Sequence, residues 1–216
     1  LRTARAAHAH LRARHPVWTG QGEVYSGFAH GVAAMHASLR QLASTGGDAA
    51  ASADADDLLR SERELRDPAS GRWFVSSRRD RTASGWCNGS AGILLGRLLA
   101  LRAGHPADAD SQEEVDHLLD DVERNGFGND ITACHGDLGS LDVLRLAAQV
   151  LDDSVLGARV EATAAQLVDQ QLATFRSAPR SRFALVDSIF LGAAGAGHAL
   201  LRSHAPEVVP AFLWLD

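Results

Sequence analysis

The residues best suited to chemistry are the two cysteines, Cys87 and Cys134, and the histidine beside the second one, His135. Each cysteine lies at the start of a glycine-punctuated, apolar stretch that is typical of a helix. Zinc prefers Cys thiolate and His nitrogen, and a catalytic zinc site leaves one position open for a substrate. These three side chains would supply three ligands and leave the fourth position free. The alternative is a pair of buried structural cysteines, since free Cys is among the most buried residue types.

A shared metal site requires Cys134 and His135 to lie on a loop. Adjacent residues of a helix point about 100° apart, because the helix has 3.6 residues per turn, so they rarely bind one metal. Gly136 follows directly and permits the unusual backbone that such a loop needs. We therefore expect this segment to leave regular helix and to meet the loop around Cys87.

A third stretch with chemical potential is Ser26–Gly31, which ends in His30-Gly31 just before an apolar helical pattern. Histidine can act as a general acid or base, because its ordinary pKa lies near neutral pH. A histidine at the start of a helix can equally be a capping or buried residue that hydrogen bonds to the backbone. The residues alone leave both interpretations of His30 open.

A repeat indicates how these stretches meet. Glycine followed three residues later by Gly or Ala, and then by an apolar helix, begins at Gly31, Gly89, Gly136 and Gly192. The starts are roughly 50 to 60 residues apart, enough for one helical hairpin each in a solenoid or toroid. Small residues let backbones approach closely at each start. We therefore expect the four loops to gather at one end, bringing His30 to the cysteines.

The hydrophobic pattern predicts an all-α chain. The expected helices cover 1–14, 31–43, 58–66, 91–103, 111–124, 139–151, 156–175 and 192–203. Residues 46–57, small and acidic, are predicted to be a loop or a partly disordered insertion. His8 is expected to be a solvated surface residue, and the segment around Pro179 to be a connector.

Composition narrows the possible functions. The net charge of −6 disfavours a nucleic-acid partner, which would require a basic surface. The longest apolar runs are too short to span a membrane, so no stable membrane insertion is expected. Two cysteines with a metal role leave none for a disulfide, which fits a reducing cytoplasm. A sugar hydrolase would need paired carboxylates at the same mouth, but Asp137 is the only acid within the four loop motifs.

Four motifs, in order, resemble those of the lanthionine synthetase C-like (LanC-like) cyclase family. Trp86-Cys87-Asn88-Gly89 and the segment from Cys134 to Gly139 look like its two zinc motifs, Ser26–Gly31 resembles its AHG segment, and 191–215 is similar to its closing motif. The resemblance implies an α/α toroid, of which about four of seven inner helices are present here. Residues 1–216 would then be the C-terminal part of a cyclase domain. The similarity is to class II synthetases (LanM type), so a dehydratase domain is expected upstream of Leu1.

The resemblance also implies a reaction. Zn²⁺ bound by Cys87, Cys134 and His135 would hold a cysteine of a lanthipeptide precursor peptide as thiolate, which adds to dehydroalanine or dehydrobutyrine to form a lanthionine ring. His30 would be the acid or base. Some family members carry an arginine where this chain has Ala83, so that role is absent or passes to Arg81 or another residue. The alternative is a noncatalytic LanC-like module that binds zinc and a thiol or peptide.

Overall fold

The computed structural model describes residues 1–105, 109–177 and 187–214, with the side chains of 171–177 left aside. The all-α prediction is confirmed: in these ranges the chain forms helices and isolated β-bridges but no strand. The helices are α1 (Arg2–Arg12), α2 (Pro16–Thr19), α3 (Val32–Gly46), α4 (Ala49–Arg63), α5 (Ser90–Arg102), α6 (Ala109–Asn125), α7 (Asp137–Val150), α8 (Ser154–Ser177) and α9 (Ala193–His204). None of the described helices has the length and apolar character needed to cross a membrane.

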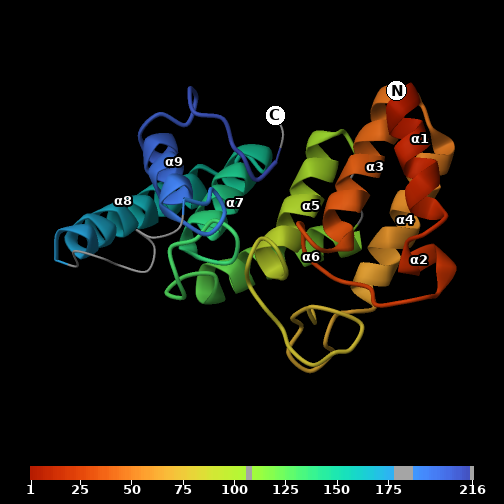
Figure 1. Ribbon diagram of the computed structural model, residues 1–216, viewed down its shortest axis with the longest axis horizontal. Helices are drawn as coiled ribbons and strands as arrows, with labels where there is room; N and C mark the ends of the chain where they lie inside the picture. Colours follow the sequence, from red (N-terminus) through yellow and green to blue (C-terminus); the bar gives the residue numbers. More distant parts are fainter. Residues whose placement is uncertain (106–108, 178–186, 215–216) are drawn as a thin grey trace.

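The helices form two layers of an α/α toroid, as predicted. The inner helices α3, α5, α7 and α9 follow one another, while α4, α6 and α8 cover them from outside (Figure 1). Helix α3 packs against α4 and α5, α5 against α6 and α7, and α7 against α8 and α9. Ten of the thirteen residues that form α5 are buried, because this helix has neighbours on several sides. The described chain therefore contributes the expected four inner helices.

The glycine repeat sets where the inner helices begin. Gly31, Gly89, Gly136 and Gly192 are the N-cap residues of α3, α5, α7 and α9. In three of the four repeats, the structure explains why the second small residue is a glycine. A Cβ at Gly92, Gly139 or Gly195 would overlap the carbonyl oxygen of the residue six positions earlier, in the preceding loop. The small residues thus let each loop fold back tightly onto its own helix.

One prediction was wrong: residues 46–57 are not a loop, because α4 begins at Ala49. The side chain of Asp48 accepts a hydrogen bond from the Ala51 N–H at 3.1 Å and caps the helix. Alanine is the best helix former, and the segment is rich in it. Ala51 and Ala55 are fully buried beside α3. Small side chains here serve close helix packing, which a search for large apolar residues overlooks.

The prediction for His8 was also wrong. Its imidazole is buried, and Nε2 lies 2.7 Å from Oδ2 of Asp54 on α4. Arg12 pairs with the other carboxylate oxygen of Asp54. Helix α1 is therefore attached to α4 by a buried polar cluster. The predicted connector around Pro179 lies outside the described residues.

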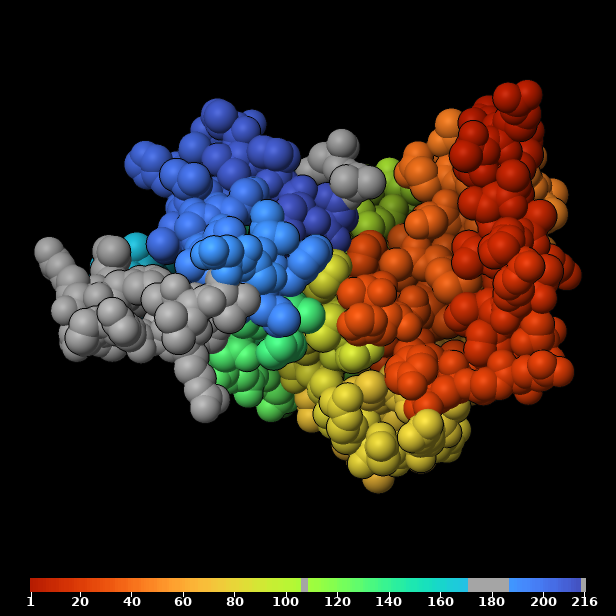
Figure 2. Space-filling view, in the orientation of Figure 1, coloured from red at the N-terminus to blue at the C-terminus, as the bar shows by residue number. Residues whose placement is uncertain are grey.

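Buried ion pairs join the inner and outer layers near the predicted site. Arg97 on α5 contacts Glu62 of α4 at 2.8 Å and Glu114 of α6 at 3.2 Å. The other oxygen of Glu62 accepts the backbone N–H of Gly27 at 3.4 Å. This network therefore holds the loop that carries His30. The connector between α4 and α5 projects from the molecule (yellow in Figure 2), and its Trp73 is buried.

Candidate metal centre

The structure brings the three predicted metal-binding residues together. One ligand atom each from Cys87, Cys134 and His135 lies within 4.8 Å of the other two. Cys87 is buried, Cys134 is half-buried and the His135 side chain is 51% exposed, so the cluster opens to the surface on its histidine side. Donors this close, with one side accessible, fit a metal that also takes an external ligand.

Backbone hydrogen bonds join the four loops that precede the inner helices. The N–H of Cys87 donates to the carbonyl of Cys134 at 2.9 Å, and the N–H of Cys134 donates to the carbonyl of Phe190 at 3.1 Å. On the other side, the N–H of His30 donates to the carbonyl of Cys87 at 3.3 Å. Gly85 allows the close approach, since a Cβ there would lie 2.8 Å from the His135 Cα. The predicted gathering of the loops at one end is confirmed.

Electrostatics at the cluster favour a cation. Burial, together with the neighbouring thiol of Cys87 and the carboxylate of Asp130, raises the pKa of Cys134 to about 12. Without a positive charge, a thiolate here lacks both water and a counter-charge. A divalent cation supplies that charge and deprotonates coordinating thiols outright. The donor set therefore fits zinc, which Cys87, Cys134 and His135 would hold.

Asp130 orients the histidine, a role that sequence reasoning missed. Its Oδ2 lies 3.1 Å from Nε2 of His135, while its Oδ1 accepts the N–H of Thr132 at 2.7 Å. A carboxylate that accepts the Nε2–H leaves Nδ1 as the nitrogen with a free lone pair. The only signal in the sequence was an acid in the loop before Cys134.

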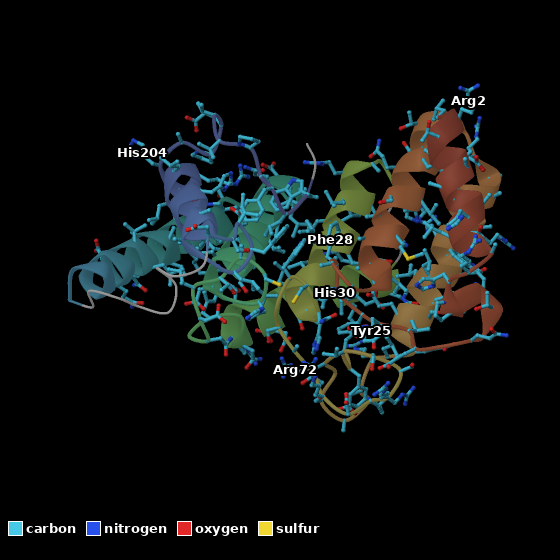
Figure 3. All side chains as sticks on the ribbon, viewed as in Figure 1. Arg2, Tyr25, Phe28, His30, Arg72 and His204 are labelled. Atoms are coloured by element: carbon cyan, nitrogen blue, oxygen red, sulfur yellow. The ribbon has the colours of Figure 1, made fainter. Side chains whose placement is uncertain are left out.

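His30 lies beside the cluster but is not one of its three members. Its N–H bond to Cys87 fixes the backbone, and its side chain is exposed. Among the interactions of the described residues, none engages its imidazole. Figure 3 shows His30 close to Phe28 at the start of α3, far from His204 at the end of α9. Within the described part of the chain, the imidazole of His30 is therefore exposed and held by no other side chain.

A cavity of about 630 Å³ adjoins the cluster, and Cys87 and His135 both line it. Ala83 also lines it, as do Arg72 and Arg81. Arg72 is fixed, since its two terminal nitrogens donate to Thr82 and Ser84 at 2.9 and 2.8 Å. The lining of this cavity therefore includes two guanidinium groups, while Ala83 contributes only a methyl group.

The carboxylate of Asp137 serves the loop rather than the cavity. Its Oδ1 accepts the N–H of Gly128 at 2.9 Å. Burial raises its pKa, and the hydrogen bonds from the loop oppose that rise. The side chain therefore holds the turn before Cys134, and it gives no support to a hydrolase with paired carboxylates.

Comparison with known proteins shows the family of the chain and a solved structure with a similar fold. The chain has no match among curated protein sequences. The solved structure titled "Nisin cyclase" has a similar fold, with a TM-score of 0.65 and 16% sequence identity. The match covers 94% of this chain and 50% of that chain, so this chain spans about half of the nisin cyclase length. Residues 8–214 match the family described as "Lanthionine synthetase C-like protein". This protein is a member of that lanthionine synthetase C-like family.

Proposed function

We propose that the protein is a zinc-dependent lanthipeptide cyclase, which forms lanthionine or methyllanthionine rings in a precursor peptide. The observation that carries the proposal is the cluster of Cys87, Cys134 and His135 at the edge of an accessible cavity. Membership of the LanC-like family and the fold shared with nisin cyclase support it.

Zinc, when bound, would stabilise the substrate cysteine as a thiolate, which is the nucleophilic form. The reaction adds this sulfur to the β-carbon of dehydroalanine or dehydrobutyrine in the same peptide. One C–S bond forms, the C=C π bond breaks, and the α-carbon takes a proton. The peptide therefore loses a free thiol without any change in mass.

His30 is the proposed proton carrier. Its imidazole is exposed, and the backbone N–H of the same residue donates to the carbonyl of Cys87. It can deliver the proton to the α-carbon or accept the proton of the incoming thiol. Glu62 and Arg97 stabilise the loop that carries His30, because Glu62 accepts the N–H of Gly27 in that loop and pairs with Arg97.

The setting of the reaction is also a proposal. The chain spans half of the nisin cyclase length, and residues 191–215 resemble the closing motif of the family, so we place residues 1–216 in the C-terminal part of a cyclase domain. Resemblance to class II synthetases suggests a dehydratase domain earlier in the same natural chain as the source of the dehydrated peptide. Since both cysteines must stay thiols, we place the protein in the reducing cytoplasm. The residues encoded before Leu1 test the domain assignment.

The test uses the full-length protein, loaded with zinc, and a dehydrated precursor peptide. We expect loss of peptide thiol at constant mass, and loss of that activity in His30→Ala. The matched control is His204→Ala, an exposed histidine distant from the site (Figure 3). Cys87→Ala should lower bound zinc to background.

Each outcome has a distinct meaning. Thiol loss unaffected by His30→Ala would remove this residue from the mechanism, and full zinc occupancy in Cys87→Ala would contradict the ligand assignment. If the wild type bound zinc and peptide but formed no ring, the noncatalytic LanC-like module would be the correct description.

A further inference from the structure

Four aromatic rings form a continuous row beside the candidate metal centre: Phe28, Trp86, Phe190 and Phe212. Trp86 and Phe190 are stacked, with ring centroids 5.4 Å apart and planes 9° apart. The ring centroids of Phe28 and Trp86 are 6.0 Å apart. Phe212 meets Phe190 edge-on, with ring centroids 5.6 Å apart. The row connects the loop of His30, the loop of Cys87, the loop before α9 and the C-terminal tail.

The glycine repeat explains why Phe190 belongs to the site. Cys87, Cys134 and Phe190 each stand two residues before the N-cap glycine of an inner helix, which is Gly89, Gly136 and Gly192 respectively. The backbone bond from the Cys134 N–H to the Phe190 carbonyl continues the series that joins the two cysteines. Phe190 thus occupies in its repeat the position that carries a metal-binding thiol in the two before it.

Phe190 is the exposed ring of the row, whereas Trp86 is buried and Phe28 and Phe212 are partly buried. Ile189, Phe190 and Leu191 are three consecutive large apolar residues, and their exposed fractions are 39%, 38% and 45%. Phe28 and Phe212 also line a second cavity, of about 410 Å³, together with Ala34 and Leu99. Apolar area left open beside a concave surface favours the burial of an apolar ligand group.

We infer that the aromatic row selects precursor peptides with an apolar residue next to the reacting cysteine, and that Phe190 is the determinant of this selectivity. The inference depends on the proposed function. A peptide thiol that reaches Cys87, Cys134 and His135 brings its chain neighbours to the rim of the same loops. On the other side, the lining of the cavity includes Arg72, Arg81 and three asparagines. On the side of the row, Ile189, Phe190 and Leu191 offer exposed apolar surface for a neighbouring side chain of the peptide.

The test compares two dehydrated peptides that differ at one position, Leu or Ser directly before the cysteine. We expect the zinc-loaded, full-length wild type to cyclise the Leu peptide with a kcat/KM roughly tenfold higher, the size of discrimination that an apolar contact provides. Phe190→Ala should reduce this ratio to about twofold. Leu201→Ala, an exposed apolar residue of α9 outside the row, should leave the ratio unchanged.

A second readout separates this inference from the proposed function. Versions of the two peptides with Ala in place of the cysteine cannot cyclise, and their binding is measured by fluorescence anisotropy. Ring formation with equal ratios in wild type and Phe190→Ala overturns the inference and leaves the cyclase intact. If no ring forms with either peptide, the cyclase proposal fails. In that case a binding preference for Leu that Phe190→Ala removes would support the row as a peptide site, and equal binding would overturn it.

Discussion

The role of Asp130 gives the sharpest prediction about zinc affinity. In Asp130→Asn the side-chain oxygen can still accept the Thr132 N–H, so the loop before Cys134 keeps its turn. The amide nitrogen then faces Nε2 of His135, and it cannot accept a hydrogen bond. The histidine loses the contact that fixes its tautomer and ring orientation. We therefore expect weaker zinc binding in a protein that is otherwise folded.

The geometry sets the size of the effect. Removing a carboxylate that supports a metal-binding histidine typically costs 10- to 100-fold in metal affinity. Here the side chains of His135 and Asp130 are 51% and 28% exposed, so water can partly replace the lost contact. The expected loss is therefore near the lower end, about tenfold. This corresponds to about 1.4 kcal/mol of binding free energy.

The assay is a zinc titration of the full-length protein against a chromophoric chelator at fixed pH. Asp152→Asn, on the turn between α7 and α8, is the control, because Asn tolerates the positive φ of 52° at that position. Circular dichroism checks that both variants keep their helices. An affinity of Asp130→Asn within about twofold of wild type would refute the proposed orienting role.

Three further predictions concern the support of the site. Arg97→Met leaves Glu62 and Glu114 buried without their shared partner, so urea unfolding should show a loss of about 3–5 kcal/mol, and a loss below about 1 kcal/mol would contradict it. Burial raises the pKa of Glu62 above its ordinary value of 4.5, so the folded state holds its proton more tightly and loses stability as pH rises through the folded pKa. In Arg97→Met the loss of the guanidinium raises this pKa further, so the deficit should be smaller at pH ~5 than at pH ~8, and an equal deficit would argue against the assignment. Gly85→Ala would push a Cβ against His135, so bound zinc per chain should fall, whereas full occupancy would show that the loops can separate without cost.

The clustering of Cys87, Cys134 and His135 could be predicted because its signals are local. Two cysteines in the whole chain, each followed by an N-cap glycine at the same offset, define both the ligands and the loops that carry them. The repeat also contained the position of Phe190, but its side chain is not a metal ligand and so it was not considered. Local chemistry and repeat register were sufficient to bring these three residues together, and the metal itself stays a prediction.

What could not be predicted depends on contacts between distant segments. The burial of His8 depends on Asp54, 46 positions away, and no periodicity of α1 indicates that pairing. The first part of α4, residues 49–57, was missed since its buried apolar residues are alanines, whose value lies in close packing against α3. The contact of Asp130 with His135 depends on the path of the loop between them.

The most direct test of the account is zinc X-ray absorption on the full-length protein, with and without the dehydrated peptide. We expect two sulfur ligands at about 2.3 Å and at least one nitrogen at about 2.0–2.1 Å in the free protein. Addition of the peptide should raise the sulfur count from two to three, as the substrate thiol joins Cys87 and Cys134. A zinc shell without sulfur, or a sulfur count that the peptide leaves unchanged, would contradict the claim that these residues hold a metal that binds the reacting cysteine.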